Sequence, residues 1–238
     1  MDQEPIALRV YELIAEQYAA RVDTKPHNAF YDRPATLSLL PPVAGLKVLD
    51  AGCGPGAYAE WLVDRGAEVI AIDVSPKMAG LASDRLKDRA KILNADFSKP
   101  LDFLGDGSMD IVLSALTMDY IRNWSSVFCE FNRVLRSGGL LVFSAGHPAA
   151  EFFEYHKDGN YFDVEQVSYV WRGFGTVVNM PYYRRPLGEM INPLIAAGFA
   201  IEHILEPKPV DEFKDYDPGH YEKLMRQPGF ICFRARKD

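Results

Sequence analysis

The chain has 238 residues, of which 48% are hydrophobic and 25% are charged, a composition typical of a folded domain that excludes extensive disorder. Its formal net charge of -7 would repel a long phosphate backbone over most of the surface, so a nucleic-acid partner is disfavoured. Three widely spaced cysteines fit reduced thiols without metal-ligand spacing, and no apolar run approaches the ~20 residues of a membrane helix, which together predict a cytoplasmic protein with neither a membrane span nor a metal centre.

The first part of the chain alternates between helical and strand patterns. In chain order we expect a helix over residues 7–20, a strand over 47–50, a helix over 57–65, a strand over 69–73, a helix over 76–87, strands over 91–93 and 110–113, a helix over 125–136 and a strand over 140–144. Ser75 before Pro76 marks a helix start, and Gly138 with Gly139 marks a helix stop. Because parallel strands need crossover connections, the alternation predicts an α/β fold with a doubly wound, mostly parallel, Rossmann-like sheet.

The pattern changes after residue 144. Residues 152–183 contain 10 aromatic side chains in 32 positions, which is 31% against 12% for the whole chain. We expect this aromatic-rich insertion to fold over the ligand cleft as a lid, or to form the subunit interface of a homodimer. A helix over 187–197 follows, and strand-like runs over 199–205 and 229–234 predict a hairpin that adds a C-terminal antiparallel strand. The prolines between those two runs predict a surface loop.

Three glycines at alternate positions follow the first predicted strand, in the stretch VLDAGCGPG. Gly52, Gly54 and Gly56 lack the Cβ atoms that would hold a ligand away from the main chain, and they permit the positive φ angles of a tight turn. The helix that begins near residue 57 points its free N–H groups toward the same place. This loop therefore suits an anionic group such as a phosphate or a carboxylate.

Acidic residues end the first three predicted strands. Asp73 ends the second strand, next to Val74, where a carboxylate accepts hydrogen bonds from two ribose hydroxyls. Asp50 precedes the glycines, where it would repel a pyrophosphate and attract an ammonium group, or would support the loop. Asp96 follows the third strand and suits an adenine amino group, with Phe97 covering the ring. The spacing also satisfies the dinucleotide fingerprint, so a nicotinamide (NAD or NADP) dependent oxidoreductase is an alternative.

The stretches VLDAGCGPG, VIAIDVSPKM, LNADF, MDIVLSALTMDYI and RVLRSGGLLVFSAGHP resemble class I S-adenosylmethionine-dependent methyltransferases, and within them the type 11 methyltransferase domain of small-molecule enzymes. The resemblance implies that S-adenosyl-L-methionine is the cofactor, S-adenosyl-L-homocysteine the product, and in-line displacement the reaction. The glycine loop would hold the methionine part, Asp73 the ribose and Asp96 the adenine amino group. Phe97 would supply a main-chain N–H to the adenine, and Ser114 and Ala115 would face the sulfonium.

The resemblance also divides the chain into four parts. Residues 1–36 would form a helical segment over the cofactor cleft, 37–148 the cofactor-binding core, 149–186 the lid or interface, and 187–238 a helix and a hairpin that complete the sheet. In the first part, Tyr18 is a candidate contact of the cofactor and Tyr31 a candidate contact of the substrate. Ordinary packing is the alternative for each of these tyrosines.

Methyl transfer from an activated sulfonium needs chiefly alignment, and a general base is an optional addition. His147 follows the fifth predicted strand, and a histidine pKa of about 6.5 suits proton abstraction at neutral pH, while a histidine before proline is also a common loop anchor. The candidate substrate residues are Tyr31, Asp119, Tyr120, Trp171, Tyr183 and Arg184. Structural packing is the alternative for Asp119 and Tyr120, and a solvated charge beside Glu189 is the alternative for Arg184 and its neighbour Arg185.

Two absences bear on the methyl acceptor. SALTMDYI lacks both prolines of the N/D-P-P-Y/F tetrapeptide that amino-methylating nucleic-acid enzymes of this fold usually show, and Cys129 lies in a predicted helix rather than in a Pro-Cys loop. Together with the acidic net charge, these absences favour a small-molecule acceptor. A module that binds the cofactor without catalysis is the remaining alternative.

Overall fold

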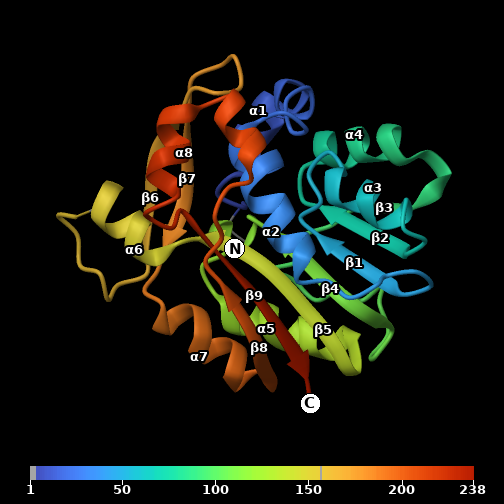
Figure 1. Ribbon diagram of the computed structural model, residues 1–238. Coiled ribbons are helices and arrows are strands. Elements are labelled where there is room, and N and C mark those ends of the chain that lie inside the picture. The colour runs from blue at the N-terminus through green and yellow to red at the C-terminus, as the bar shows by residue number, and fades with distance from the viewer. Residues whose placement is uncertain (1–3, 156) are drawn as a thin grey trace.

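The computed structural model describes residues 4–155 and 157–238 (Figure 1). Residues 1–3, at the start of the expected N-terminal segment, and residue 156, inside the aromatic-rich segment, lie outside the described residues. In the part of the chain that the structure describes, no helix combines the length and the apolar character that crossing a bilayer requires.

A seven-stranded sheet forms the centre of the molecule, with the strand order β3-β2-β1-β4-β5-β9-β8. The strands are β1 (Lys47–Ala51), β2 (Glu68–Asp73), β3 (Lys91–Asn94), β4 (Met109–Ala115), β5 (Leu135–Gly146), β8 (Phe199–Leu205) and β9 (Phe230–Lys237). Strands β1 to β5 pair in parallel, whereas β9 pairs antiparallel with both β5 and β8. The doubly wound α/β fold with an antiparallel C-terminal strand is thus confirmed. The strand order reverses between β1 and β4, and ligands of open α/β sheets bind at such a switch point.

Helices cover both faces of the sheet (Figure 1). Helices α5 (Trp124–Val134) and α7 (Gly188–Ala196) contribute to one apolar core, and α2 (Arg33–Ser38), α3 (Ala57–Val63) and α4 (Pro76–Leu86) contribute to the other. Neighbouring residues of one strand belong to different cores: Val48 lies in the second and Leu49 in the first. Successive strand side chains point to opposite faces, so the strands of a sheet covered on both sides appear as continuous apolar runs.

The end of α5 differs from the sequence prediction. The helix expected over 125–136 ends at Val134, because Leu135 already begins β5. A Cβ atom on Gly139 would lie 2.8 Å from the carbonyl oxygen of Arg136, so only glycine fits this turn of the chain. The register between β4 and β5 shifts at the same place. The glycine pair therefore forms an irregularity inside a longer strand, not a loop before a shorter one.

The aromatic-rich segment forms a second, two-stranded antiparallel sheet of β6 (Glu165–Trp171) and β7 (Val178–Arg184). This hairpin packs on the N-terminal helix α1 (Leu8–Ala19) through an apolar cluster that includes Ile14, Phe174 and Met180. In Figure 1 the orange hairpin and the blue helix stand above the carboxyl ends of the parallel strands. Together they form a roof over the switch point.

The connection between β8 and β9 is not the simple surface loop that its prolines suggested. It contains the short helix α8 (Pro218–Leu224), in which Pro218 occupies the first turn and the Asp217 carboxylate accepts the His220 N–H at 3.0 Å. This helix packs through Tyr221 on Tyr31 and Phe213, next to the N-terminal segment. The loop thus supplies a third element of the roof, because its cap and its apolar face outweigh its proline content.

Candidate active site

A cavity of about 520 Å³ lies at the carboxyl ends of the parallel strands, beneath the roof. Its floor comes from the segments that follow β1, β2, β3, β4 and β5, and its roof comes from α1, the β6–β7 hairpin and α8. The side chains that line it divide into two groups. One group surrounds the glycine loop and the ends of β2 and β3, and the other is rich in tyrosine and surrounds the end of β5.

The glycine loop between β1 and α3 has the left-handed conformation that its sequence predicts. Gly52, Gly54 and Gly56 have φ angles of 82°, 53° and 86°. A Cβ atom on Gly52 would lie 2.5 Å from the Thr117 side chain, whereas nothing lies within 4 Å of the corresponding position on Gly54. The loop is therefore packed on one side and open on the other. Gly52 and Gly54 line the cavity, and Gly56 caps α3 behind them.

Asp73 joins the glycine loop to the next helix. Its Oδ2 accepts the Gly54 N–H at 2.8 Å, and its Oδ1 accepts the Ser75 N–H at 2.9 Å. Burial raises the pKa of Asp73 to about 6, and the two main-chain N–H groups offset part of that rise. Asp73 lines the cavity beside Val74. Each carboxylate oxygen keeps a second lone pair, which leaves acceptor capacity for a ligand hydroxyl.

Three further residues that we expect to contact the cofactor line the cavity beyond the glycine loop. Asp96 and Phe97 line the cavity after β3, and the Asp96 Oδ1 accepts the Ser98 N–H at 2.9 Å. Ala115 lines the cavity after β4. The adjacent residue Leu116 has a φ of 52°, a strained conformation for a branched side chain that the sequence gave no means of predicting.

Asp50 and Ser114 are buried behind the cavity wall, and neither is among the described residues that line the cavity. The Ser114 hydroxyl bonds the Ala51 carbonyl oxygen at 3.0 Å and the Thr117 hydroxyl at 2.6 Å, and so fixes the floor. Asp50 is 1% exposed, and its Oδ2 has no hydrogen-bond partner among the described residues. Burial, reinforced by the charge of Asp73, raises the pKa of Asp50 to about 7. This geometry matches the alternative in which Asp50 supports the loop.

The second part of the cavity combines tyrosines with two carboxylates. The Tyr11 and Tyr120 hydroxyls lie 2.7 Å apart, and Trp171 packs edge-on to Tyr11. Glu151, from the π-helix η4 (Glu151–Tyr155), accepts the Tyr182 hydroxyl at 2.5 Å. Burial raises the pKa of Glu151 to about 7. Asp119 accepts the Gly146 N–H at 2.8 Å, and burial raises its pKa to about 6.

Comparison with known proteins agrees with this geometry. A family model described as a methyltransferase domain matches residues 49–143, from β1 to β5. An S-adenosylmethionine-dependent methyltransferase from Mesorhizobium loti superposes with a TM-score of 0.70 at 27% identity, over 91% of this chain and 100% of the other. The chain belongs to the class I S-adenosylmethionine-dependent methyltransferases. No comparison supports the dehydrogenase or the non-catalytic module.

Two curated relatives show how much of the chain is shared with other proteins. An uncharacterised protein of Haemophilus influenzae is 30% identical over 230 residues, which is 88% of each chain. A demethylmenaquinone methyltransferase of Tropheryma whipplei is 35% identical over 121 residues, which is 49% of this chain and 48% of that one. The first covers most of this chain, whereas the second covers about half of either chain.

The methyltransferase cavity fits S-adenosylmethionine, the cofactor of the family. The open face of Gly54 leaves room for a ligand against bare main chain, and Asp73 offers acceptors beside it. Asp50 supports the loop from behind, as a buried acid whose Oδ2 has no hydrogen-bond partner among the described residues. In the described part of the chain, no three His, Cys, Asp or Glu residues are grouped as metal ligands.

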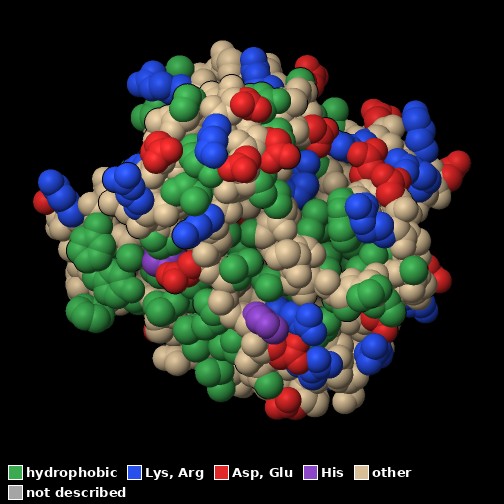
Figure 2. Space-filling view, in the orientation of Figure 1, with side chains coloured by type: hydrophobic (Ala, Val, Ile, Leu, Met, Phe, Trp, Pro, Cys, Tyr) green, Lys and Arg blue, Asp and Glu red, His purple; other side chains and the backbone are tan. Residues whose placement is uncertain are grey.

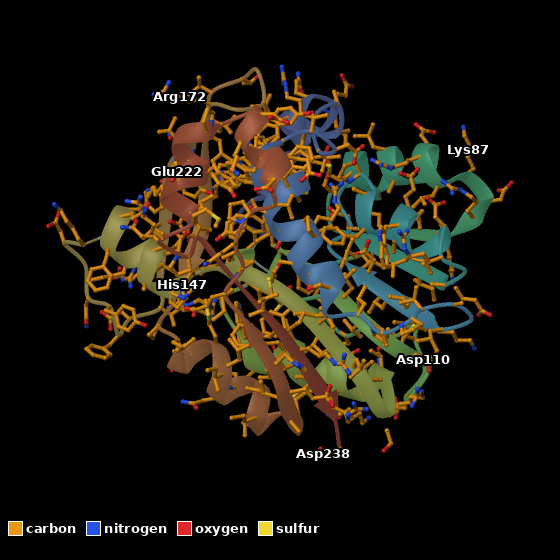
Figure 3. The ribbon with its side chains drawn as sticks, in the orientation of Figure 1. Lys87, Asp110, His147, Arg172, Glu222 and Asp238 are labelled. Carbon is orange, nitrogen blue, oxygen red and sulfur yellow. The ribbon has the colours of Figure 1, made fainter. Side chains whose placement is uncertain are left out.

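His147 has the position of a loop anchor. Its Nε2 lies 2.7 Å from a Glu206 carboxylate oxygen, its Nδ1 accepts the Ala149 N–H at 3.3 Å, and it caps the short helix α6 (Pro148–Ala150). It is 8% exposed and is not among the described residues that line the cavity, although Figure 3 shows it at the end of β5 as expected. Both ring nitrogens are engaged by the loop, so this geometry gives no support to catalysis by His147.

Some of the expected substrate residues line the cavity, and others do not. Tyr31, Asp119, Tyr120 and Trp171 line the cavity, and so does Tyr18. Tyr183 and Arg184 are not among the described lining residues. Tyr182 points into the cavity, so its neighbour Tyr183 points to the opposite side of the strand.

The two arginines after β7 are buried and structural. Arg184 is 1% exposed, pairs with Glu165 at 2.5 Å and lies over the Phe152 ring. Arg185 lies 4.1 Å from the centre of the Trp124 ring and donates to the Ile121 carbonyl oxygen at 2.6 Å. The expectation of solvated charges beside Glu189 was therefore wrong for both, because each guanidinium binds main-chain carbonyls inside the protein.

Sequence reasoning did not identify Glu151 and Tyr182, which line the cavity and are hydrogen-bonded to each other. Glu151 was one of many acids, and nothing in the sequence marks the π-helical turn that brings it inward. A usable signal was its position, five residues after the end of β5 at the edge where ligands bind. Tyr182 and Tyr169 were counted only as members of the aromatic-rich segment.

That segment also has an exposed side. Phe153 and Phe162 are 69% and 79% exposed, and Figure 2 shows hydrophobic side chains gathered on the left of the molecule, over the loop that follows α6. The segment therefore has the lid position over the cavity through Trp171 and Tyr182, and its outer surface retains the composition of an interface. The lid and the homodimer both stay predictions.

Proposed function

We propose that this methyltransferase methylates a small molecule that is enclosed in the cavity. The single observation that carries the proposal is the roof: α1, the hairpin and α8 cover the switch point and leave about 520 Å³, a volume typical of small-ligand sites. The acidic net charge and the relative named for demethylmenaquinone support a small acceptor over nucleic acid. A cytoplasmic location is part of the same proposal.

Several residues of the chain would hold the cofactor. Asp73 would accept the ribose hydroxyls, Asp96 the adenine amino group, and the glycine loop would lie against the methionine part. Tyr18 closes the cavity from α1, where its hydroxyl accepts the Asn28 amide at 3.3 Å. Burial raises the Tyr18 pKa to about 12, so the phenol stays neutral beside the cofactor.

When bound, the cofactor supplies a methyl group on a sulfonium, which a nucleophile displaces in line. The residues of the chain then have two tasks. The walls orient the acceptor, and alignment of this kind supplies about 7–11 kcal/mol of a barrier. The apolar roof, with Phe174 and Met180 buried, excludes water from the donor.

Methyl-labelled S-adenosylmethionine tests the proposal directly. The protein is incubated with the labelled cofactor and a cell extract, and the label is then divided between a low-molecular-weight filtrate and the retained macromolecules. We expect the label in the filtrate, and none above background with Asp73→Asn, which lowers cofactor affinity. Label retained on protein or nucleic acid would contradict the proposal.

A further inference from the structure

Two carboxylates face the tyrosine-rich part of the cavity from opposite sides of one residue. Asp119, on the 3-10 helix η3 (Met118–Tyr120), accepts the Gly146 N–H at 2.8 Å. Glu151 Oε1 lies 2.9 Å from the position that a Cβ atom on Gly146 would take. A side chain on Gly146 would thus collide with Glu151, so the glycine lets the second carboxylate approach the first.

Each carboxylate has an arginine only at longer range: the charge of Arg185 lowers the pKa of Asp119, and that of Arg184 lowers the pKa of Glu151. Among the described residues, the hydrogen-bond partners of Glu151 and Asp119 are a tyrosine hydroxyl and a main-chain N–H, and no lysine or arginine lies within ion-pair distance of either. Burial is the largest cause of the raised pKa of each group, and the charge of Asp119 raises that of Glu151 further. Two half-buried acids that form no ion pair with a lysine or arginine among the described residues are costly, and a cation placed between them would relieve that cost.

The aromatic wall beside the carboxylates suits the same kind of ligand. Tyr169 packs edge-on to Tyr182 with ring centres 5.1 Å apart, and Tyr11 packs edge-on to Trp171 at 6.2 Å. These rings line the cavity, and the face of an aromatic ring attracts a cation, most strongly where water is excluded. Aromatic faces and carboxylates together favour an ammonium group over an anion or a neutral hydroxyl.

The two lysines that line the cavity have partners other than Glu151 and Asp119. Lys223 pairs with Glu154 at 2.6 Å, and Lys25 lies 4.3 Å from the centre of the Phe174 ring. Figure 3 shows Arg172 at the far tip of the hairpin, away from the end of β5. An acceptor carboxylate or phosphate placed against Glu151 and Asp119 would therefore meet two like charges, while the guanidinium groups of Arg184 and Arg185 are engaged by Glu165 and by main-chain carbonyls.

We propose that the methyl acceptor is a basic amine whose ammonium group binds between Glu151 and Asp119 against the tyrosine wall. This inference rests on the proposed function and names its substrate class. Before transfer, one N–H bond of the ammonium breaks, the proton goes to a Glu151 carboxylate oxygen, and the N–H electron pair stays on nitrogen as the lone pair that accepts the methyl group. Tyr182 donates its hydroxyl hydrogen to the same carboxylate and so orients it.

A matched ligand series tests the recognition without turnover. Sets of alkyl and arylalkyl compounds share a carbon skeleton and end in an amine, a hydroxyl or a carboxyl group. Their affinities are measured by calorimetry on the protein saturated with S-adenosylhomocysteine. We expect at least one amine to bind about tenfold or more tightly than its hydroxyl and carboxyl counterparts, the fold-change typical of a charge-assisted hydrogen bond.

Variants tie the preference to the carboxylates. Glu151→Gln should remove most of the amine preference and leave the affinity of the alcohols unchanged. Asp119→Asn is the second variant if Glu151→Gln does not fold, with folding judged by circular dichroism. The control is Glu222→Gln, the same chemical change on the exposed face of α8, which should alter nothing.

The outcomes separate this inference from the proposed function. Equal affinities across the series, a preference for alcohols or acids, no amine binding, or an amine preference that survives both variants overturns the amine assignment. The proposed function then stands as long as the protein binds S-adenosylhomocysteine and labels a small molecule. Loss of that labelling refutes the proposed function itself.

Discussion

Gly52 shows how one residue connects the turn to the site. Its φ of 82° belongs to the left-handed region, and the Thr117 side chain fills the space where a Cβ atom would lie. Thr117 is itself fixed, because its hydroxyl bonds the Ser114 hydroxyl at 2.6 Å and the Ala51 carbonyl oxygen at 3.3 Å. The glycine is therefore required by conformation and by contact at once.

Gly52→Ala should destabilise the protein more than an alanine at another left-handed glycine. Gly45 is the matched control, because its φ is 75° and nothing lies within 4 Å of its Cβ position. We expect Gly45→Ala to cost about 1 kcal/mol of unfolding free energy and Gly52→Ala about 2 kcal/mol or more, with weaker S-adenosylhomocysteine binding. Urea unfolding of both variants measures the difference. Equal losses would mean that Thr117 yields and that the contact has no importance.

Asp50 should make stability depend on pH. Its pKa is about 7 in the folded protein against an ordinary value of 3.8, mainly because burial penalises the charged form. The stabilisation from the neutral acid is thus complete below 3.8 and is lost as the pH rises through about 7. Asp50→Asn should reduce the fall in unfolding free energy between about pH 5 and pH 8, by up to about 1.4 kcal/mol per pH unit. Denaturant unfolding at both pH values measures it.

The control for that change is Asp84→Asn, at an exposed position of α4. It should leave the pH dependence as it is in the wild type. Asp73, whose pKa is raised to about 6, would still contribute a fall in stability in both variants. An Asp50→Asn protein with the wild-type pH profile would show that this carboxylate is not the buried group that titrates.

At this scale the sequence predicted the floor of the site better than its walls. Gly52, Gly54 and Asp73 were found because a strand, a glycine turn and a strand-end acid have fixed offsets along the chain. Glu151 and Tyr182 were missed because they meet only through tertiary packing. His147 lies at the end of β5 as expected, but its ring contacts Glu206, an acid 59 residues further along the chain.

At the scale of elements, Glu12 connects helix α1 to the start of α4 by hydrogen bonds. The Glu12 carboxylate accepts the Lys77 N–H at 3.0 Å and the hydroxyl hydrogen of Ser75, at the start of α4. The Lys77 ammonium returns a bond to the Glu12 carbonyl oxygen at 2.8 Å. Because Tyr11 and Tyr18 reach the cavity from this helix, its docking controls one wall of the roof.

Glu12→Ala should loosen the roof without unfolding the core. The loss of these hydrogen bonds weakens the docking of α1 by about 1 kcal/mol, which corresponds to roughly fivefold faster release of S-adenosylhomocysteine. Stopped-flow measurement of the release rate tests this, with Glu16→Ala on the exposed side of the same helix as control. An unchanged rate in Glu12→Ala would show that α1 does not gate the cavity.

The roof elements were also the hardest to predict. In β6 the aromatic side chains Tyr169 and Trp171 share the inward side, whereas in β7 the adjacent Tyr182 and Tyr183 face opposite sides, so a period of two is visible in β6 alone. Helix α8 was hidden by the prolines around it, although Asp217 and Pro218 form an ordinary helix start. Local sequence patterns are compatible with the hairpin and with α8. Packing on α1 and on the N-terminal segment determines that these elements form.

At the scale of the whole molecule, the alternation of apolar runs and helices was sufficient for the sheet. Both cores are continuous across β1, β4 and β5, and the antiparallel β8–β9 pair extends the sheet at one edge. The switch point between β1 and β4 then determines where a ligand can enter, and the roof determines what size of ligand it encloses. The fold thus locates the cavity, and under our proposal the roof elements select the methyl acceptor.

The most direct measurement is a crystal structure of the protein with S-adenosylhomocysteine. Our account predicts the ribose hydroxyls on Asp73, the adenine beside Phe97, and the sulfur directed toward the part of the cavity that Glu151 and Tyr120 line. A nucleoside bound elsewhere, or a sulfur directed away from Glu151, would contradict it.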